Sequence, residues 1–338
     1  MTACALLTLA YSVGCDSRAA TKAPMLATSA SETTTLAPHV AVSAPSGAST
    51  EPSDDNPPMT FAVIGDYGVN NAHELAVARL VASWSPWFVI TTGDDYSSAA
   101  GGRGTRRYDR STGDYYRNWF RHSSADSPSP IGNASVNAFF PSLGNHDYSD
   151  AHGLESYLTY FTLPGPGFTN TSGNERFYDF VQGPVHFFVL NSNPEEPDGT
   201  SATSVQARWL RRQLAASHSP WNIVYDHHPP YSSGSRHGSS GYMQWPFAAW
   251  GADAVVSGHV HTYERIVRDG IVYFVNGTGG DALYGFSTPV AGSAARYDAD
   301  WGAQRVSATN TALKFDFYNV AGVLVDSYQL PTKPLRAP

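Results

Sequence analysis

Cysteine is scarce in this chain of 338 residues: only Cys4 and Cys15 occur, and both precede residue 16. The rest of the chain therefore has no disulfide and no thiolate ligand, which excludes a disulfide scaffold and a thiolate metal site there. Charge is also sparse, because charged residues make up 15% of the sequence and give a formal net charge of -8. An acidic chain is a poor partner for nucleic acid, so an anionic substrate would need positive charge supplied locally.

Long hydrophobic runs are missing too. Residues 3–14, ACALLTLAYSVG, are too few to span a bilayer but suit the hydrophobic region of a signal peptide. With Cys15 the segment ends in SVGC, which resembles a bacterial lipobox, although Ser12 stands where that motif prefers Leu and no Lys or Arg precedes it. We expect residues 1–15 to direct export, leaving the protein secreted, periplasmic or membrane-anchored at the cell surface through a lipidated Cys15.

Residues 16–58 consist mainly of Ala, Ser, Thr and Pro, without apolar periodicity. Such a segment cannot bury enough apolar surface to fold, so we expect a disordered tether. The composition changes at Met59, and residues 59–338 hold enough apolar residues for a large folded domain.

The folded part alternates between apolar runs and loops rich in Asp, Asn or His. Helical spacing of apolar residues appears near residues 71–83, 152–162 and 203–217, between the apolar runs, which favours an α/β fold. The runs and their loops are MTFAVIGDYG, WFVITTGDD, AFFPSLGNHD, HFFVLNSN, WNIVYDHHP and DAVVSGHVH. Further strands are expected at IVYFVN and in LKFDFYNVAGVLVDSYQL, where Asn-Val-Ala-Gly indicates a hairpin.

Five of these loops carry side chains that can bind metal ions. Open α/β sheets place their sites at the carboxyl ends of strands, where such loops converge. His259 and His261 are two residues apart, so an extended backbone points both imidazoles to one side. Carboxylate, amide and imidazole donors without thiolate suit iron, manganese or zinc, and an aspartate can bridge two ions. The donors are Asp66, Asp94, Asn145, His227, His259 and His261.

Each motif has a simpler interpretation on its own. A Gly-Asp pair after a strand is commonly a turn, in which Asp66 or Asp94 caps its own backbone. Asn145 suits a turn with positive φ, and His227 with His228 is compatible with an ordinary loop. A metal site has the advantage of explaining all five loops together.

The ordered series GDYG, GDD, GNHD, VYDH and GHVHTYER resembles the metallophosphoesterase superfamily, over residues 60 to about 280. Within it, GHVHTYER and HHPPYSSG are most similar to the purple acid phosphatases and their bacterial relatives, in a short single-domain form. The resemblance implies an α/β fold, a two-sheet β sandwich flanked by helices with the metal site at the strand carboxyl ends. It also makes residues 59–338 the catalytic domain.

The resemblance further implies two metal ions, iron together with zinc, manganese or a second iron. By the family pattern, Asp66 and His261 bind the first ion and Asp94 bridges both. The second ion is then bound by Asn145, His227 and His259.

Two further histidines are implied to act on the substrate. His146 matches the family histidine that contacts the phosphate and protonates the leaving oxygen, although a neutral structural histidine is the alternative. His237 stands where some relatives have a second histidine facing the phosphate. Asp147 is expected to support an imidazole, or else to be surface charge.

One position departs from the family pattern. Purple acid phosphatases have a tyrosine ligand of iron three residues after the bridging aspartate, but here Ser97 holds that position and Tyr96 comes one residue early. Asp94 and Tyr96 can share a face of an extended loop, which would keep Tyr96 as a ligand. The shift can equally turn the phenol away and leave a colourless site.

The expected function is hydrolysis of phosphate monoesters, of the acid phosphatase type, by attack of a metal-bound hydroxide. The alternative with the same ligands is a phosphodiesterase acting on nucleotides or other diesters. Tyr231, Tyr242 and Trp245 either stack on a base or simply cover the sheet edge. A third reading is a binding module that keeps the fold without catalysis. A small phosphate ester is the expected partner.

Overall fold

The computed structural model describes residues 57–121, 132–149 and 153–331. All of them belong to one compact unit, Glu51–Pro338. The expected signal segment at residues 1–15, with Cys15, and the tether up to residue 56 lie outside the described residues. Within the described ranges no helix has the length and hydropathy needed to cross a membrane.

The first sheet has the strand order β13-β12-β11-β1-β2-β3. β1, β2 and β3 run parallel, whereas β11 pairs antiparallel with β1 on its other side. Their bounds are β1 Met59–Ile64, β2 Phe88–Thr91, β3 Phe139–Pro141, β11 Gly302–Ala308, β12 Leu313–Asn319 and β13 Leu324–Gln329. The expected C-terminal hairpin is confirmed, since β12 and β13 are antiparallel and the Asn319 N–H donates to the Val323 carbonyl.

The second sheet has the order β10-β8-β9-β7-β6-β5-β4. β5, β6, β7 and β9 form its parallel centre. The bounds are β4 Tyr178–Gln182, β5 Val185–Val189, β6 Trp221–Tyr225, β7 Ala254–Ser257, β8 Tyr263–Arg268, β9 Ile271–Asn276 and β10 Ser293–Tyr297. Both sheets are therefore mixed, with parallel strands where the expected ligands occur.

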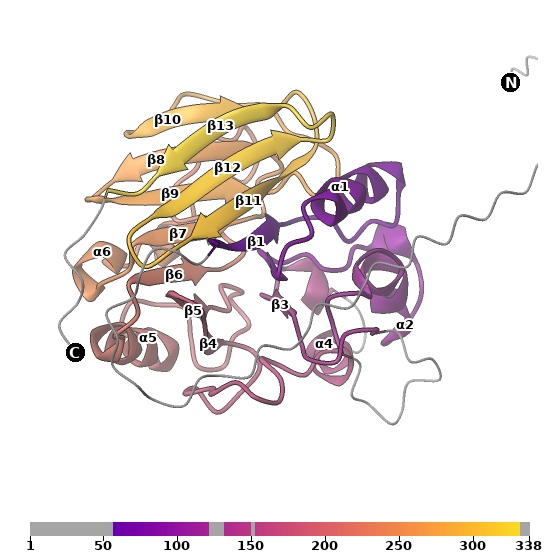
Figure 1. Ribbon diagram of the computed structural model, residues 1–338, viewed down its shortest axis with the longest axis horizontal. Helices are drawn as coiled ribbons and strands as arrows, with labels where there is room; N and C mark the ends of the chain where they lie inside the picture. The colour runs from indigo at the N-terminus through magenta and orange to yellow at the C-terminus, as the bar shows by residue number, and fades with distance from the viewer. Residues whose placement is uncertain (1–56, 122–131, 150–152, 332–338) are drawn as a thin grey trace, which may run out of the picture. The chain divides into compact units, whose positions relative to one another are not determined.

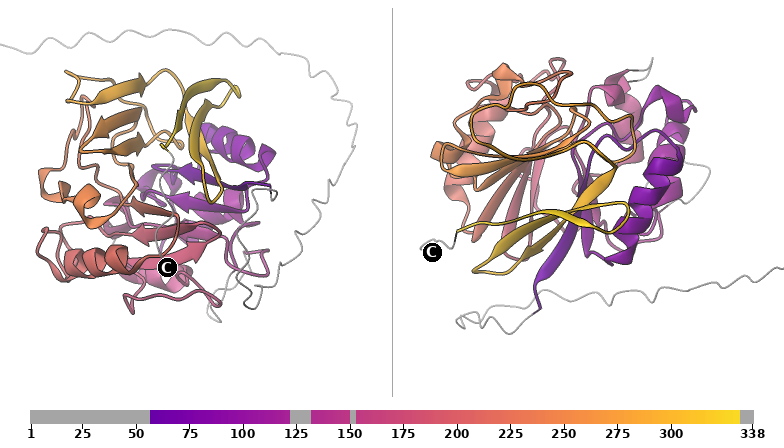
Figure 2. Two further views of the ribbon diagram at one scale, coloured as in Figure 1. Left: turned by 60° about the vertical axis from the view of Figure 1, so that its left-hand side comes forward. Right: turned by 90° about the horizontal axis from the view of Figure 1, so that it is seen from above.

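The helices cover the outer faces of the sheets (Figures 1 and 2): α1 lies on the side of the first sheet, and α5 and α6 on the side of the second. Side-chain caps begin two of them, because Asn71 accepts from the His73 and Glu74 N–H groups and Ser204 accepts from the Ala207 N–H. The α-helices of four or more residues are α1 Ala72–Ser83, α4 Gly153–Tyr160, α5 Val205–Ala216 and α6 Phe247–Trp250, and η2 Asp109–Gly113 is a five-residue π-helix. The three-residue helical turns are η1 Ser98–Ala100, α2 Arg106–Tyr108, α3 Asp114–Tyr116, η3 His146–Tyr148 and η4 Gly241–Met243.

The main core lies between the two sheets. Alternation along β6 shows how it forms: Ile223 and Tyr225 join the main cluster, while Val224 joins the cluster beneath α5 and α6. Across the sandwich, the rings of Phe61 and Phe187 meet edge to face with centroids 5.2 Å apart. The predicted two-sheet sandwich with flanking helices is confirmed.

Candidate metal centre

The loops that carry the expected ligands follow β1, β2, β3, β6 and β7. Three ligand positions have a left-handed backbone, with φ of 55° at Asp66, 53° at Asp94 and 67° at His259. Residues with a side chain rarely adopt positive φ, and such strain is concentrated at functional sites. The same conformation in three loops at one edge indicates that they are shaped for one site.

Glycines before the ligands allow these loops to approach one another. A Cβ atom on Gly144 would lie 2.2 Å from the backbone nitrogen of Asp94, and one on Gly258 would lie 2.6 Å from an Asp66 carboxylate oxygen. Only glycine avoids both clashes. The Gly-Asn and Gly-His pairs in the motifs are thus explained by close packing between loops.

His227 lies at the centre of the expected second metal position. Its Nε2 atom is 2.9 Å from Oδ1 of Asn145, 3.1 Å from Nδ1 of His259 and 3.4 Å from Oδ2 of Asp94. Four of the predicted ligands therefore present donor atoms to one small volume. The structure brings together residues from β2, β3, β6 and β7, across both sheets.

The hydrogen bonding of His227 tests whether this volume suits a cation. Its Nδ1 atom lies 2.8 Å from the carbonyl oxygen of Thr92, so Nδ1 carries the proton and Nε2 presents a lone pair. Burial lowers the pKa of His227 to about 3, which keeps the ring neutral. A lone pair facing the oxygens of Asn145 and Asp94 is repulsive without a positive ion among them. The donor set therefore fits a metal ion.

The expected first metal position is formed by Asp66 and His261. Nε2 of His261 lies 3.4 Å from Oδ1 of Asp66, while its Nδ1 is bound at 2.7 Å to the carbonyl of Ala282. That carbonyl fixes the ring with Nε2 toward the carboxylate. Asp66 also accepts the His259 N–H at 2.8 Å, so the loops after β1 and β7 hold each other.

Asp94 lies between the two positions. One ligand atom from each of Asp66, Asp94 and His227 falls within a group whose members are all within 4.8 Å of one another. Burial, and next the charge of Asp66, raise the pKa of Asp94 well above its usual value. Two buried carboxylates this close favour a cation that neutralises them both. This position is consistent with the predicted bridging role.

The two predicted substrate histidines lie at the mouth of this site. Nε2 of His146 is 4.0 Å from Oδ2 of Asp94, and 38% of its side chain is exposed. His237 is exposed, and its ring centroid lies 4.3 Å from that of His259. Both are therefore accessible to a molecule bound over the metal positions, and their roles stay predictions.

Tyr96 is placed differently from the other predicted ligands. It is 6% exposed, with the Arg107 guanidinium 4.1 Å above its ring and the Tyr108 ring 6.2 Å away. Among the described residues, no hydrogen bond of the Tyr96 hydroxyl is found. The ring packs as part of the core, and its role as a ligand stays a prediction.

Two neighbours of the site, His228 and Tyr284, have no role predicted from the sequence. His228, treated only as the partner of His227 in a loop, is buried with its ring 4.4 Å from that of His259, and Ser192 contacts its Nδ1 at 2.9 Å. Tyr284 stacks on His261 with centroids 4.2 Å apart. The double histidine was a usable signal for His228, but nothing in the local sequence marks Tyr284.

Asp147 supports the site in a way the sequence did not predict. It is fully buried rather than on the surface, and it accepts hydrogen bonds from the Gly144 N–H at 2.8 Å and the Tyr108 hydroxyl at 3.0 Å. Its partners are thus backbone and phenol, not an imidazole. These bonds fix the loop that carries Asn145 and His146.

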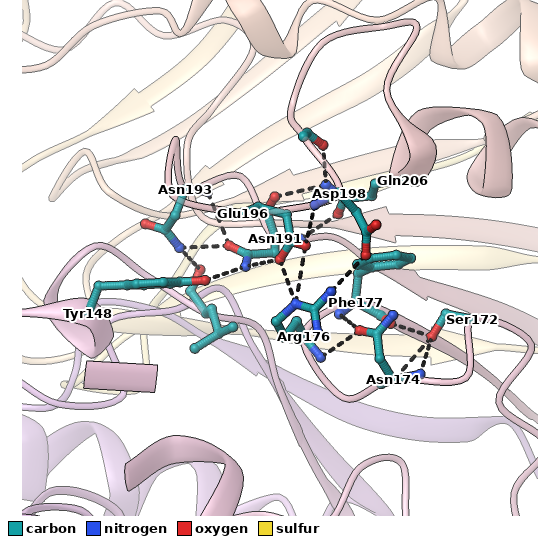
Figure 3. Close-up of polar contacts among 12 residues, drawn as sticks. Tyr148, Ser172, Asn174, Arg176, Phe177, Asn191, Asn193, Glu196, Asp198 and Gln206 are labelled. Carbon is teal, nitrogen blue, oxygen red and sulfur yellow. Dashed lines mark hydrogen bonds and ion pairs between the residues drawn. The ribbon is translucent and has the colours of Figure 1, made fainter. Parts of the chain in front are cut away.

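The same loop is held from the other sheet by the segment after β5 (Figure 3). Asn193 donates at 3.2 Å to the Leu143 carbonyl, and Asn191 donates at 2.7 Å to the Tyr148 hydroxyl. Asn191 also donates to Glu196, which Arg176 contacts through Nε at 3.1 Å. A buried polar network therefore positions the two ends of the Asn145 loop.

The Tyr-Glu-Arg sequence after His261 anchors the histidine loop. Glu264 is buried and accepts from the Ser233 N–H at 2.7 Å, which ties it to the loop after β6. Arg265 binds both carboxylate oxygens of Asp326, at 2.7 and 3.0 Å, and the Tyr263 hydroxyl donates to the same carboxylate. The motif thus connects β8 to β13 in the other sheet.

Of the aromatic residues considered at the rim, Trp245 and Tyr231 pack beneath or against the second cluster. Tyr242 is 41% exposed, and its hydroxyl donates at 3.0 Å to the Ser192 carbonyl beside His228. Two of the three therefore cover the sheet, and only Tyr242 lies exposed near the site.

Residues 59–263 match the family described as calcineurin-like phosphoesterase. The match includes every predicted metal ligand and covers more than half of the chain. The chain belongs to the calcineurin-like phosphoesterase family.

Within that family the chain is similar to purple acid phosphatases. It is 27% identical to purple acid phosphatase 23 of Arabidopsis thaliana over 262 residues, covering 68% of this chain and 54% of the relative. A purple acid phosphatase from yellow lupin superposes with a TM-score of 0.61 at 18% identity, over 81% of this chain and 54% of that one. The expected resemblance is confirmed, and the chain spans about half the length of the curated relatives that it matches.

A second solved structure has the same similarity. The Plasmodium protein described as "GAP50 the anchor in the inner membrane complex" superposes with a TM-score of 0.61 at 18% identity, over 82% of this chain and 90% of that one. At this identity the superposition shows the fold alone, so function must be argued from the site.

Proposed function

We propose that this protein is a metal-dependent phosphatase that hydrolyses phosphate monoesters with two metal ions. The observation that carries the proposal is the group formed by Asp66, Asp94 and His227, with Asn145 at 2.9 Å from His227. Two neutral imidazoles, an amide oxygen and buried carboxylates in one volume suit iron, zinc or manganese. Similarity to purple acid phosphatases supports iron with zinc or a second iron.

Bound ions would supply Lewis acidity, activating water and neutralising phosphate charge. The residues of the chain divide the remaining tasks. Asp94 balances charge between the two positions, and the carbonyls of Thr92 and Ala282 fix the His227 and His261 rings with Nε2 toward the site. In this proposal His146, which is accessible and 4.0 Å from Asp94, gives a proton to the leaving oxygen.

His237 is the second residue proposed to contact the phosphate. The centroid of its exposed ring lies 4.3 Å from that of His259 and 5.7 Å from that of Tyr284. A donor there would orient a phosphate oxygen in the ground state and the transition state. The diesterase alternative keeps the same ligands and differs in what the mouth of the site accepts.

The test is hydrolysis of 4-nitrophenyl phosphate against bis(4-nitrophenyl) phosphate by the full chain, across acid to alkaline pH, after loading with iron, zinc or manganese. Preference for the monoester with an acidic optimum supports the proposal. Preference for the diester would replace it with the diesterase. If the metal-loaded protein hydrolyses neither ester, the proposal is overturned in favour of a protein that binds its ligand without catalysis.

We also propose that the protein is exported and that Cys15 anchors it to a membrane surface. The support is the apolar segment of residues 3–14 followed by SVGC. Expression of the full chain and of a Cys15→Ser variant in a bacterial host, followed by fractionation, tests it. Anchoring predicts membrane recovery for the wild type only.

A further inference from the structure

Two segments that contain none of the predicted metal ligands lie beside the site and are joined by backbone hydrogen bonds. The first, here called the rim loop, comprises residues 232–240, and the second comprises residues 284–287. Gly234 and Phe286 form an antiparallel bridge, the Ser235 N–H donates to the Gly285 carbonyl at 2.8 Å, and the Ser287 N–H donates to the Ser233 carbonyl at 2.7 Å. The two segments therefore hold each other in a fixed register.

Buried Glu264 anchors the rim loop from below. It accepts from the Ser233 N–H and hydroxyl and from the Ser293 hydroxyl, which is on β10. Ser239 closes the loop by accepting the Ser232 N–H at 3.0 Å, and His237 is held at a φ of 67°. A loop with this many fixed contacts presents its outward side chains in defined positions.

One of those outward side chains is Arg236. Its guanidinium carbon lies 4.6 Å from the centroid of the Tyr284 ring, and the same ring stacks on His261 at 4.2 Å with an interplanar angle of 12°. The Tyr284 N–H donates at 3.0 Å to the His261 carbonyl, which fixes the tyrosine beside the ligand. Tyr284 thus contacts both a predicted metal ligand and an arginine.

Within the described residues no carboxylate neutralises the charge of Arg236. The side chain is exposed, and no Asp or Glu of residues 57–121, 132–149 and 153–331 forms an ion pair with it, although the chain as a whole is acidic. In contrast, Arg176 and Arg265 each contact carboxylates within 3.1 Å. A guanidinium held on an aromatic ring keeps its donors free for a planar anion.

We propose that Arg236, supported by Tyr284, forms a subsite for a second anionic group on the substrate, a carboxylate or phosphate carried by the leaving group. The proposal rests on the phosphatase function proposed above. The His237 ring lies 4.3 Å from the His259 ring, whereas Arg236 contacts the Tyr284 ring, which itself stacks on His261. The guanidinium is therefore placed to contact a group beyond the phosphate that reacts.

The test compares kcat/KM for two matched pairs of substrates on the metal-loaded full chain. The compact pair is 3-phosphoglycerate and glycerol 3-phosphate, and the rigid longer pair is 4-carboxyphenyl phosphate and phenyl phosphate. Arg236→Ala should reduce kcat/KM by about tenfold for the carboxylate member of at least one pair, the cost of one charge-assisted contact. The member without the carboxylate should stay within about twofold of the wild type.

Two variants serve as controls. Arg296→Ala removes another exposed arginine, which lies 5.9 Å from the centroid of the neighbouring Phe286 ring. This variant should leave kcat/KM unchanged for both substrates of each pair. Arg236→Lys keeps the charge without the planar fork and should give an intermediate loss. Because the contact is exposed, raising the salt concentration should shrink the wild-type preference for the carboxylate substrates.

Each outcome is decisive. Equal losses for both members of each pair would mean that Arg236 serves the reacting phosphate or the loop, and would overturn the subsite. No loss for any substrate would overturn it as well, and both results would leave the phosphatase function standing. If the wild type hydrolyses none of the four esters, the phosphatase function fails and the subsite fails with it.

Discussion

Nε2 of His227 lies 2.9 Å from Oδ1 of Asn145, and this contact joins a loop of one sheet to a loop of the other. His227 follows β6 in the second sheet, and Asn145 follows β3 in the first. A metal ion held by both residues would cross-link the two halves of the sandwich. Metal binding and stability of the fold should therefore be coupled.

This coupling gives the first prediction. Removal of metal with a chelator should lower the Tm of the full chain, because an ion that binds only the folded state at 100 times its Kd stabilises it by about 2.7 kcal/mol. Differential scanning calorimetry with and without added metal measures the shift. Asp94→Asn should show a much smaller shift, while Asp114→Asn, which changes an exposed ion pair, should respond like the wild type. A shift that is unaffected by Asp94→Asn would contradict the predicted site.

Gly144→Ala should damage both stability and the site. The new Cβ would meet the backbone nitrogen and Oδ1 of Asp94 at 2.2 Å, so one of the two loops must move. Overpacking of this kind costs about 1–3 kcal/mol, and here it also displaces the carboxylate that is predicted to bridge the two metal ions. Urea unfolding and metal titration measure the two effects. Gly241→Ala is the matched control, since its Cβ would have no atom within 4 Å, and equal behaviour of the two variants would refute this explanation.

Arg176→Ala should destabilise the network behind the Asn145 loop. The Glu196 side chain is fully buried and the Arg176 side chain is 21% exposed, so the substitution leaves a buried carboxylate without its cation. Breaking such a pair costs about 3 kcal/mol in the free energy of unfolding. The comparison variant is Arg117→Ala, whose ion pair with Asp114 is exposed and contributes about 0–1 kcal/mol. Similar losses of unfolding free energy in both variants would show that the Arg176 network stabilises the fold no more than an exposed ion pair does.

Acidification should remove the stabilisation provided by Asp326. Burial alone would raise its pKa, but the hydrogen bonds from Arg265 and Tyr263 outweigh burial, and the net pKa is lowered. A carboxyl group with a lowered pKa in the folded state stabilises the fold above its unfolded pKa, and this contribution is lost as pH falls through the folded pKa. Free energies of unfolding for the wild type and Asp326→Asn should therefore differ at neutral pH and converge as the pH falls below the usual pKa range of a carboxyl group. A constant difference across that range would count against the ion pair as its source.

Much of the fold could be predicted because parallel strands buried on both faces are continuous apolar runs. MTFAVI and WNIVY are of this kind, and they are β1 and β6. β11, with the sequence GAQRVSA, mixes apolar and polar residues and gave no comparable signal. Its place beside β1 depends on long-range pairing, which local patterns do not contain.

The site was predictable to the level of single loops. The motifs place Asp66, Asp94 and His259 directly after strands. The contact between His227 and Asn145, however, depends on how the two sheets pack against each other, which local sequence does not show. Tyr284 shows the limit more sharply. It reaches His261 through the pairing of the rim loop with residues 284–287, and its own sequence surroundings carry no motif.

The most direct test of the account is the number of metal ions bound per chain after the full-length protein is reconstituted with metal. Inductively coupled plasma mass spectrometry gives the metal concentration, which is divided by the protein concentration. The account predicts two ions for the wild type, and fewer than two for Asp94→Asn because that carboxylate is shared. One ion or none in the wild type, or two ions retained by Asp94→Asn, would contradict the two-metal centre.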